Sequence, residues 1–551
     1  MIGPLRRAAA IAKMAVALAL IAGCSETPAP GADGTGATAQ AAEGVVFRRG
    51  LPGEPDSLDP HRSEEAATHD LLRDLFEGLT AAAQGGEPRP AAASGWTLEE
   101  DGRLYRFTLR PGGRWSNGDP VVAEDFAASL RRAVDPATGS AYSVVLSAIE
   151  NAPEIIAGER PPADLGVEAT AELELVIRLA QPTPYLLGLL ANPVAFPVHR
   201  PSLAEHGPGF ARAGKLVSNG PYRLTDWVVN DRLRLERNPY YDDGWPVAVD
   251  TVYYLPLEEP AAELQRYRAG ELDFTESIPN GRFDWIREQF GDQLVVAPYL
   301  AVYYYMFNTT RAPFDDAGLR SALSMVVNRE LLTERVTGVG ELPAYTFVPP
   351  GVNGHNVQLP DWFEAVPAER LAEARRLYAA AGFSEESPLR VQLVYNTGDN
   401  HKRVALAVAS MWKEALGVEV EPVNMELKVM LERRRDRSAW TVMRLGWVGD
   451  YDDAYNFLEI MRSDHGQNDT GFSDAEYDRL LDLAALETDP ARRSELLEAA
   501  ERLMLAQAPV LPLYFNVTKH LVQPWVEGFE PNILDHNYTR YLAIDTRARG
   551  Y

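Results

Sequence analysis

The chain has 551 residues, of which 46% are hydrophobic and 24% charged, and its formal net charge is −26. This excess of acidic residues argues against a nucleic-acid-binding surface and favours solubility. At about 100 to 200 residues per domain, the length predicts two to four domains. No internal repeat of about 20 to 50 residues indicates a solenoid, and no apolar stretch beyond the N-terminal segment has the length of a membrane span.

The N-terminal segment predicts export. Basic residues precede an apolar run at 14–22, which is too short to span a bilayer and leads through small residues to Cys24. We expect a lipoprotein signal peptide at 1–23, lipid attachment at Cys24, and a flexible tether at 24–44 that is rich in Ala, Gly, Thr and Pro. Cys24 is the only cysteine, so the chain can form no internal disulfide.

Helical and strand patterns alternate through the first two hundred residues. Apolar residues recur at helical spacing over 69–79 and 124–134, and they alternate as in strands over 104–109 and 172–179. The Gly- and Pro-containing segment at 111–120 indicates turns between them.

Residues 217–243 combine a turn, an alternating strand pair and a closing Asn-Pro. Asn219-Gly220-Pro221 predicts a turn, and Asp231 lies between two expected strands at 222–229 and 232–237. From these residues alone, the segment indicates a hairpin, and an ordinary edge ribbon of a mixed sheet would explain it.

The second half of the chain repeats the mixture of strands and helices. Expected strands lie at 250–256 and 389–395, and expected helices lie at 316–328, 368–381, 402–416, 474–486 and 490–506. We expect the chain to fold into two lobes and to cross from one lobe to the other twice, near Leu300 and near Phe515. Such crossings would form a hinge with a cleft between the lobes.

Residues 217–243 resemble the oligopeptide-binding proteins of bacterial ABC importers, members of the extracellular solute-binding protein family 5. The segments 54–60, 74–79 and 115–118 resemble other motifs of that family, and the similarity extends over roughly 46–541. The resemblance implies a two-lobed α/β periplasmic-binding-protein fold with an inserted domain and mixed sheets. The expected parts are lobe I (45–76, 201–300 and 517–551), the inserted domain (77–200) and lobe II (301–516).

The same resemblance implies a function. A monomeric lipoprotein of the cell envelope would capture short peptides between its lobes and present them to an ABC permease, without a cofactor, a metal or nucleic acid. Relatives of this fold bind dipeptides, metal chelates, haem or sugars, so a different ligand stays open. An envelope peptide sensor or chaperone is also consistent with the sequence.

Ligand chemistry is expected along residues 444–451. A free peptide presents an ammonium, a carboxylate and a repeating backbone, so a receptor that ignores side chains needs an anion, a cation and an open strand edge. By resemblance, Asp450 would bind the ammonium and Arg444 the carboxylate. Gly446 and Gly449 lack side chains and would leave room for the added backbone, which would pair with intervening residues such as Val448. Trp447 would wall a side-chain pocket. From the residues alone, Asp450 could equally cap a turn.

Other positions match the family around the cleft. His401 would help bind a tripeptide carboxylate, with Arg433, Arg434 or Arg435 serving other lengths, although a solvated His401 after a capping Asp399 or Asn400 is the alternative. Leu427 stands where close peptide binders carry tryptophan, which indicates a reshaped pocket. The remaining candidates are Glu64 (with Glu65 as the rival), Ala66, Tyr142, Tyr267 and Tyr304, although aromatic stripes more often belong to a core.

An enzyme is the competing class, but the sequence does not support it. The chain lacks Gly-x-Ser-x-Gly, His-Glu-x-x-His, a P-loop and a dinucleotide-binding glycine fingerprint. Its only cysteine lies in the signal region, which removes a thiol nucleophile. Asp450 and Asp452 could bind calcium, but the spaced ligand set of a calcium loop is not evident.

Overall fold

The structure, a computed structural model, describes residues 44–63 and 68–550. The expected signal peptide and Cys24 lie outside the described residues, and so do Glu64 and Ala66. Within the described part of the chain, no helix combines the length and the apolar character that a membrane span requires.

The first lobe is built around a four-stranded sheet of order β1-β10-β9-β8. Strands β1 and β10 are parallel, and the others are antiparallel. The predicted hairpin is confirmed, because β8 and β9 pair from Tyr222–Arg237 to Val228–Arg232. The elements are β1 (Val46–Leu51), α1 (His69–Leu75), β8 (Tyr222–Val228), β9 (Arg232–Arg237), β10 (Thr251–Pro256), α6 (Pro260–Arg268), α7 (Phe283–Phe290), β17 (Val526–Glu527) and β18 (Ala543–Ile544).

The inserted segment forms a second antiparallel sheet of order β4-β5-β7-β6 and shares the apolar core of the first lobe. Phe47 and Leu72 of the first lobe belong to the same buried cluster as Phe107 and Phe126 of the insertion. The elements are β2 (Thr80–Ala82), β3 (Pro88–Pro90), β4 (Ala93–Glu99), β5 (Leu104–Leu109), α2 (Ala123–Val134), α3 (Ala152–Ile156), β6 (Val167–Ala171), β7 (Glu174–Arg178), α4 (Leu186–Leu189) and α5 (Arg200–His206).

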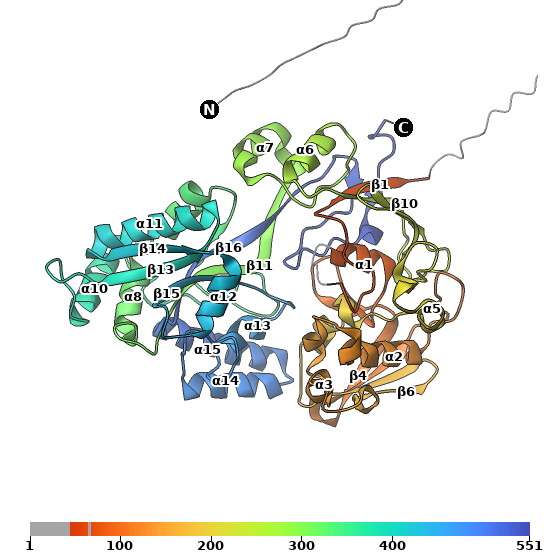
Figure 1. Cartoon of the computed structure of the whole chain (residues 1–551), viewed down its shortest axis with the longest axis horizontal. Coiled ribbons are helices and arrows are strands. Elements are labelled where there is room, and N and C mark those ends of the chain that lie inside the picture. The colour runs from red at the N-terminus through yellow and green to blue at the C-terminus, as the bar shows by residue number, and fades with distance from the viewer. Residues whose placement is uncertain (1–43, 64–67, 551) are drawn as a thin grey trace, which may run out of the picture. The chain divides into compact units, whose positions relative to one another are not determined.

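The second lobe contains a six-stranded mixed sheet of order β12-β16-β11-β15-β13-β14, covered by helices (Figure 1). Its predicted helices and strand are confirmed to within about three residues at each end. The elements are β11 (Leu294–Phe307), α8 (Ala317–Met325), α9 (Arg329–Leu331), β12 (Leu342–Pro343), α10 (Pro367–Ala380), β13 (Arg390–Asn396), α11 (Asp399–Leu416), β14 (Glu419–Met425), α12 (Leu427–Arg435), β15 (Val442–Val448), α13 (Tyr455–Leu458), α14 (Ala475–Leu486), α15 (Pro490–Gln507) and β16 (Val510–Leu521).

Local sequence explains where these helices begin and end. The Asp489 side chain accepts hydrogen bonds from the first backbone amides of α15, and Pro490 occupies the first helical turn. Helix α11 buries Val404, Val408 and Trp412 on one face and ends at Gly417, whose φ of +76° suits glycine.

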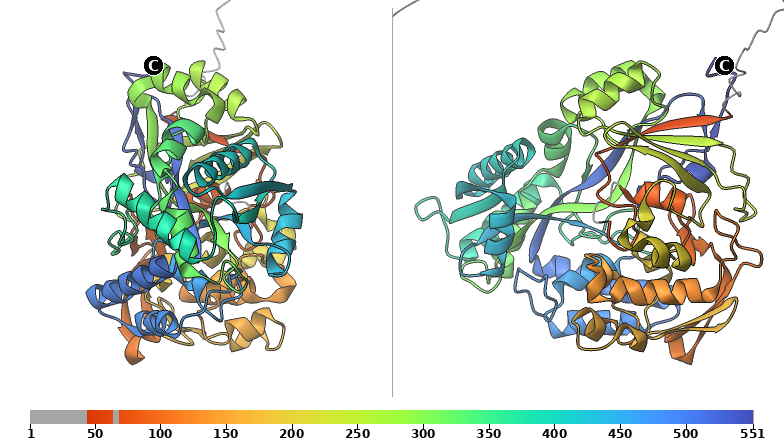
Figure 2. Two further views of the ribbon diagram at one scale, coloured as in Figure 1. Left: turned by 90° about the vertical axis from the view of Figure 1, so that its left-hand side faces the viewer. Right: turned by 45° about the vertical axis from the view of Figure 1, so that its right-hand side comes forward.

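Strands β11 and β16 pass from one lobe to the other, and Figure 2 follows them from two further directions. They pair antiparallel from Leu294–Leu521 at one end to Met306–Val510 at the other, with a register shift between Pro298 and Val302. Leu294 packs in the cluster of α6 and α7, whereas Val302 packs in the core of the second lobe. The two predicted crossings fall on these strands, and hinge motion there stays a prediction.

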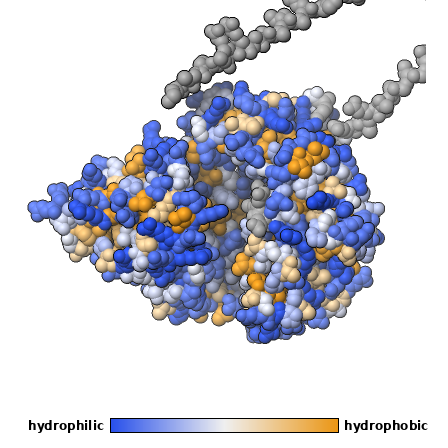
Figure 3. Space-filling view, in the orientation of Figure 1, coloured by the Kyte–Doolittle hydropathy of each residue, from blue (hydrophilic) through white to orange (hydrophobic). Residues whose placement is uncertain are grey.

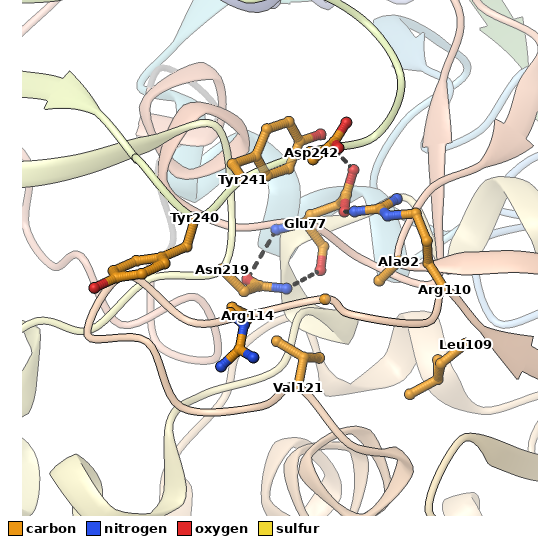
Figure 4. Close-up of a pocket in the computed structure, with 11 residues that line it drawn as sticks. Glu77, Ala92, Leu109, Arg110, Arg114, Val121, Asn219, Tyr240, Tyr241 and Asp242 are labelled. Atoms are coloured by element: carbon orange, nitrogen blue, oxygen red, sulfur yellow. Dashed lines mark hydrogen bonds and ion pairs between the residues drawn. The ribbon is translucent and has the colours of Figure 1, made fainter.

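Glu77 ties the sequence signature at 217–243 to Arg110 and Arg540. Figure 4 shows Glu77 with Asn219, Tyr241 and Arg110. Asn219 accepts from the backbone N–H of Glu77 at 3.0 Å and donates to its carbonyl at 2.8 Å. The Glu77 carboxylate accepts from Arg110 at 2.9 Å, Tyr241 at 2.6 Å and Arg540 at 3.2 Å. The adjoining cavity has only about 10 Å³, room for about one water, so this junction is structural.

The same junction corrects one sequence prediction. The expected helix over 69–79 ends at Leu75, because Phe76 turns to an extended conformation with φ −124° and ψ 159°. The extended chain places Glu77 against Asn219, and a Cβ on Gly220 would lie 2.7 Å from the backbone of Leu75 and Phe76. Tertiary contacts therefore end the helix before its apolar pattern does.

An ion pair between a buried histidine and a half-buried aspartate attaches the C-terminal segment to β16. His520 Nε2 lies 2.7 Å from the carboxylate of Asp535, and Nδ1 lies 2.8 Å from the Thr275 carbonyl. Two acceptors require both ring nitrogens to carry protons. Burial alone would lower the pKa of His520, but Asp535, its hydrogen bond, Glu276 and the Thr275 carbonyl outweigh burial and raise this pKa to about 9.

Gly220→Ala is expected to destabilise the first lobe by about 2–4 kcal/mol, because the new methyl group would press on the backbone where α1 ends. Denaturant unfolding monitored by circular dichroism measures the change. Gly209→Ala is the matched control, since nothing lies within 4 Å of a Cβ at that position. Equal stability of the two variants would contradict the close approach.

Asp535→Asn is expected to lower the melting temperature near pH 6, with a cost of about 1–3 kcal/mol, because it leaves a buried imidazolium without its anion. A raised folded-state pKa gives stability that is complete below pH 6.5 and lost as pH rises through about 9.

The difference from the wild type should therefore shrink between pH 7 and pH 9.5 in calorimetric scans. Glu530→Gln, a change of an exposed acid on the same segment, serves as the control. A deficit that stays constant with pH would argue against a charged His520.

Candidate ligand-binding cleft

A cavity of about 790 Å³ lies between the two lobes, with walls from both. Its first wall includes His69, Asp70, Tyr142 and His536, and its second wall includes the segment 448–453. The space-filling view shows the surface hollowed between these walls (Figure 3). This volume is in the range of small-ligand sites.

Strand β15 offers the second wall an open backbone edge. On one side it pairs with β11 over its whole length, from Val442–Phe307 to Val448–Ala301. On the other side, the pairing with β13 in the described chain is limited to Val442 and Met443. The backbone from Arg444 to Val448 is thus free to accept an added strand, and Val448 is 52% exposed there.

The two glycines near this edge play different roles. A Cβ on Gly446 would approach the Val302 carbonyl at 3.4 Å and nothing closer, so this position leaves the edge accessible. A Cβ on Gly449 would lie 2.6 Å from Leu300. The missing side chain of Gly449 thus makes room for Leu300 of β11, and its expected role beside a ligand stays a prediction.

Asp450 lies at the end of this edge and lines the cavity. Its backbone N–H donates to Asn456 Oδ1 at 3.3 Å, and the indole N–H of Trp447 donates to the same oxygen at 3.0 Å. Asp450 is exposed at the cleft surface, and partial desolvation there raises the pKa of its carboxyl against the hydrogen bond with Asn456. Trp447 packs against the core of the second lobe. Its indole and the backbone of Asp450 thus share one partner, Asn456.

Arg444 lies at the other end of the open edge. Its guanidinium stacks on the Tyr303 ring at 4.4 Å and donates to Asn396 Oδ1 at 2.9 Å. Its Nε is buried without a hydrogen-bond partner among the described residues. The guanidinium of this half-buried arginine has no carboxylate partner among the described residues, and such a cation favours an external anion.

His401 belongs to the same cluster. It lies in the first turn of α11, stacks on Tyr303 at 5.6 Å, and shares a hydrogen bond of 3.2 Å between Nδ1 and the tyrosine hydroxyl. Burial, together with the nearby Arg444, lowers the pKa of His401 to about 4. The imidazole is therefore neutral at pH 7. The residue before the helix is Gly398, and no side chain caps it, so the expected caps at Asp399 and Asn400 are wrong.

Two expected aromatic positions lie away from the cavity. Tyr304 points into the second-lobe core against Phe347, and Tyr267 is buried with its hydroxyl on Gln293. Successive strand residues point to opposite faces, so Tyr303 and not Tyr304 meets Arg444. Two of the three arginine alternatives are engaged elsewhere, since Arg433 donates to the Ala439 carbonyl and Arg434 pairs with Asp469.

Tyr142 was expected at the cavity, and it lines the wall beside His69, with ring centroids 5.8 Å apart. Three other tyrosines of the cavity were not predicted from the sequence. Tyr185, Tyr299 and Tyr451 line it as well. Tyr185 of the inserted segment stacks on Tyr451 of the second lobe at 4.4 Å. Only the three-dimensional arrangement joins these two tyrosines, because they come from segments far apart in the sequence.

The first-lobe wall is a network of compensated charges. Arg49, which is fully buried, pairs with Asp70 at 2.8 Å and also with Glu276. Arg73 pairs with Asp70 at 3.0 Å and contacts His536 Nε2 at 2.6 Å. Burial and the charge of Arg73 lower the pKa of His536 far below its usual range, so that ring is neutral. Among the described residues, no group of acidic, histidine or cysteine side chains could hold a metal ion.

Residues 87–469 match the family described as bacterial extracellular solute-binding proteins, family 5 Middle. The chain is 37% identical over 509 residues to the periplasmic oligopeptide-binding protein OppA of Salmonella typhimurium, which covers 92% of this chain and 93% of that protein.

Solved structures agree with the fold. The unliganded open form of the periplasmic murein tripeptide binding protein MppA has a TM-score of 0.86 and 37% identity, and covers 91% of this chain and 98% of that one. The Haemophilus influenzae OppA complex with the peptide RPPGFSPFR has a TM-score of 0.71 and 33% identity, and covers 91% and 99%. The chain belongs to the bacterial extracellular solute-binding proteins, family 5, a family of binding proteins and not of enzymes.

Proposed function

We propose that this protein captures short peptides in the cleft between its lobes and delivers them to an ABC permease. The observation that carries the proposal is the open edge of β15, with Arg444 at one end and Asp450 just beyond the other. An extended peptide can pair with that edge through its backbone, which makes binding tolerant of side chains. The name of the Salmonella relative, a periplasmic oligopeptide-binding protein, supports the same function.

The length of the edge sets the length of the ligand. Six residue steps at about 3.3 Å separate Arg444 and Asp450 by at most about 20 Å. An extended peptide of about five or six residues spans that distance, and the long side chain of Arg444 can reach toward a shorter one. Peptides of up to about six residues therefore fit between the two charged groups.

Closure of the lobes would complete the site. The fold resembles an unliganded open form more closely, with a TM-score of 0.86, than a peptide complex of the same family, at 0.71. Strands β11 and β16 pass between the lobes, and they would provide the hinge. Closure would bring the first wall onto the peptide and exclude water, which strengthens charge-assisted hydrogen bonds.

The site of action is the bacterial cell envelope. The OppA relatives are named periplasmic proteins, and the N-terminal sequence fits a lipoprotein signal with Cys24 as its lipidated residue. A monomer tethered at Cys24 would stay close to its permease. A solute other than a peptide is the second candidate, because members of this fold family take diverse ligands, and the peptide titrations below distinguish the two.

Asp450→Asn is expected to weaken binding of free-amine tri- to pentapeptides by about 10- to 100-fold, because a charge-assisted hydrogen bond to the ammonium contributes about 1.5–3 kcal/mol. The affinity for N-acetylated peptides, which have no ammonium, should change little. Isothermal titration of refolded, ligand-free protein measures both. Asp361→Asn, a change of an exposed aspartate in the same lobe, is the control. Equal losses for both peptide sets would exclude the ammonium contact.

Arg444→Ala is expected to weaken the binding of free-acid tripeptides by about tenfold or more, because it removes the cation proposed to bind the carboxylate. The binding of amidated tripeptides should weaken much less. The same titration measures both affinities. Arg390→Ala, which removes an exposed arginine from β13, should change neither. If the affinity for amidated tripeptides falls as much as the affinity for free-acid tripeptides, the carboxylate binds elsewhere.

A further inference from the structure

The cavity wall contains more carboxylates than its own cations neutralise. Four of the six acidic residues that line it have a positive partner within 3.0 Å. These pairs are Asp70 with Arg49 and Arg73, Glu276 with Arg49, Asp453 with Arg493, and Asp535 with His520. The other two are Asp450 and Asp452. The proposed ammonium contact uses Asp450, which leaves Asp452 without a role.

Asp452 follows the open edge by four residues and lines the same cavity. Its Oδ1 accepts a hydrogen bond of 3.0 Å from the backbone N–H of Asn353. Within residues 44–63 and 68–550, no basic side chain forms an ion pair with it. One carboxylate oxygen is held by the protein, and no cation of the described chain neutralises the group.

The surroundings of Asp452 make its negative charge costly. Burial raises the pKa of this carboxyl to about 6. The hydrogen bond from the Asn353 N–H lowers this pKa, and the charges of Asp453 and Glu87 raise it. A cation that entered the cleft would offset this cost. The wall is therefore better suited to a positively charged ligand group than to an apolar one.

Glu87 brings a second carboxylate from the opposite side of the cleft. It lies in the turn between β2 and β3, flanked by Gly86 and Pro88, which both line the cavity. The stack of Tyr185 on Tyr451 holds this inserted segment beside residues 451–453. The charges of Glu87 and Asp452 repel each other across the cleft, and a cation between them would remove that repulsion.

We propose that Asp452, with Glu87 opposite it, binds a basic side chain of the peptide, so that the protein prefers peptides that carry lysine or arginine near the ammonium end. The inference rests on the proposed peptide-binding function and narrows its substrate class. The second positive group completes the charge balance of the cleft, as the peptide ammonium does at Asp450.

A purely structural role is the rival explanation, in which Asp452 only accepts the Asn353 N–H to hold its loop. Asp452→Asn separates the two, because the asparagine oxygen can still accept that hydrogen bond while the charge is lost. Glu87→Gln removes the opposite charge at an exposed position and changes no fold contact of Asp452.

The test is isothermal titration of the refolded full-length protein with alanine tripeptides that carry lysine at position 1, 2 or 3. Each is compared with the same peptide containing norleucine, which has a similar carbon chain and no charge. At one of the first two positions, the wild type should bind the lysine peptide about tenfold more tightly. Asp452→Asn should remove that preference and leave the norleucine affinity within about twofold, and Glu87→Gln should reduce the preference.

Each other outcome overturns the inference in a distinct way. Equal wild-type affinity for lysine and norleucine peptides at positions 1 and 2 would leave peptide binding intact and exclude the basic-side-chain site. An equal loss for both peptides in Asp452→Asn would assign Asp452 to the loop alone. Absence of binding by every peptide would reject the proposed function itself. If Asp452→Asn fails to fold, an unchanged lysine preference in Glu87→Gln at low and at high salt would reject the paired site.

Discussion

The pairing of β11 with β16 is the constraint on which the rest of the molecule depends. The two strands pair antiparallel from Leu294–Leu521 to Met306–Val510, and their ends belong to different cores. Because both crossings are strands of one ladder, the lobes are joined by backbone hydrogen bonds, and the register shift near Pro298 locally relaxes the ladder. The same β11 is the neighbour of β15, so the element that connects the lobes also positions the edge that would receive a peptide.

The segment most typical of the family in sequence is not part of the cleft. Residues 217–243 form a hairpin whose Asn219 and Tyr241 bind Glu77, together with Arg110 and Arg540. A buried carboxylate with several donors is costly to disturb, which explains why this dense pattern is needed for the fold. A sequence motif can therefore identify a family through its architecture while the ligand chemistry lies elsewhere.

The chemistry of the cleft follows from which charges the protein neutralises itself. Arg49 and Arg73 compensate the acids of the first wall, and Arg493 compensates Asp453. Asp450 and Asp452 have no such partner among the described residues, and the buried Nε of Arg444 has no acceptor. Uncompensated groups in a confined site provide binding free energy for ligands of opposite charge, whereas the compensated groups fix the shape of the wall.

The sequence alone determined the family, the hairpin at 222–237 and most helices of the second lobe, because these depend on local periodicity and on motifs close together in the chain. It also placed Asp450 and Tyr142 at the cavity. It failed for Tyr304 and Tyr267, since a shift of one residue along a strand reverses the face and a helical tyrosine gives no sign of its neighbours. The tertiary structure decided the end of α1, the stack of Tyr185 on Tyr451, and which carboxylates stay without a cation. Those features depend on how separate segments meet in three dimensions, and no local pattern encodes them.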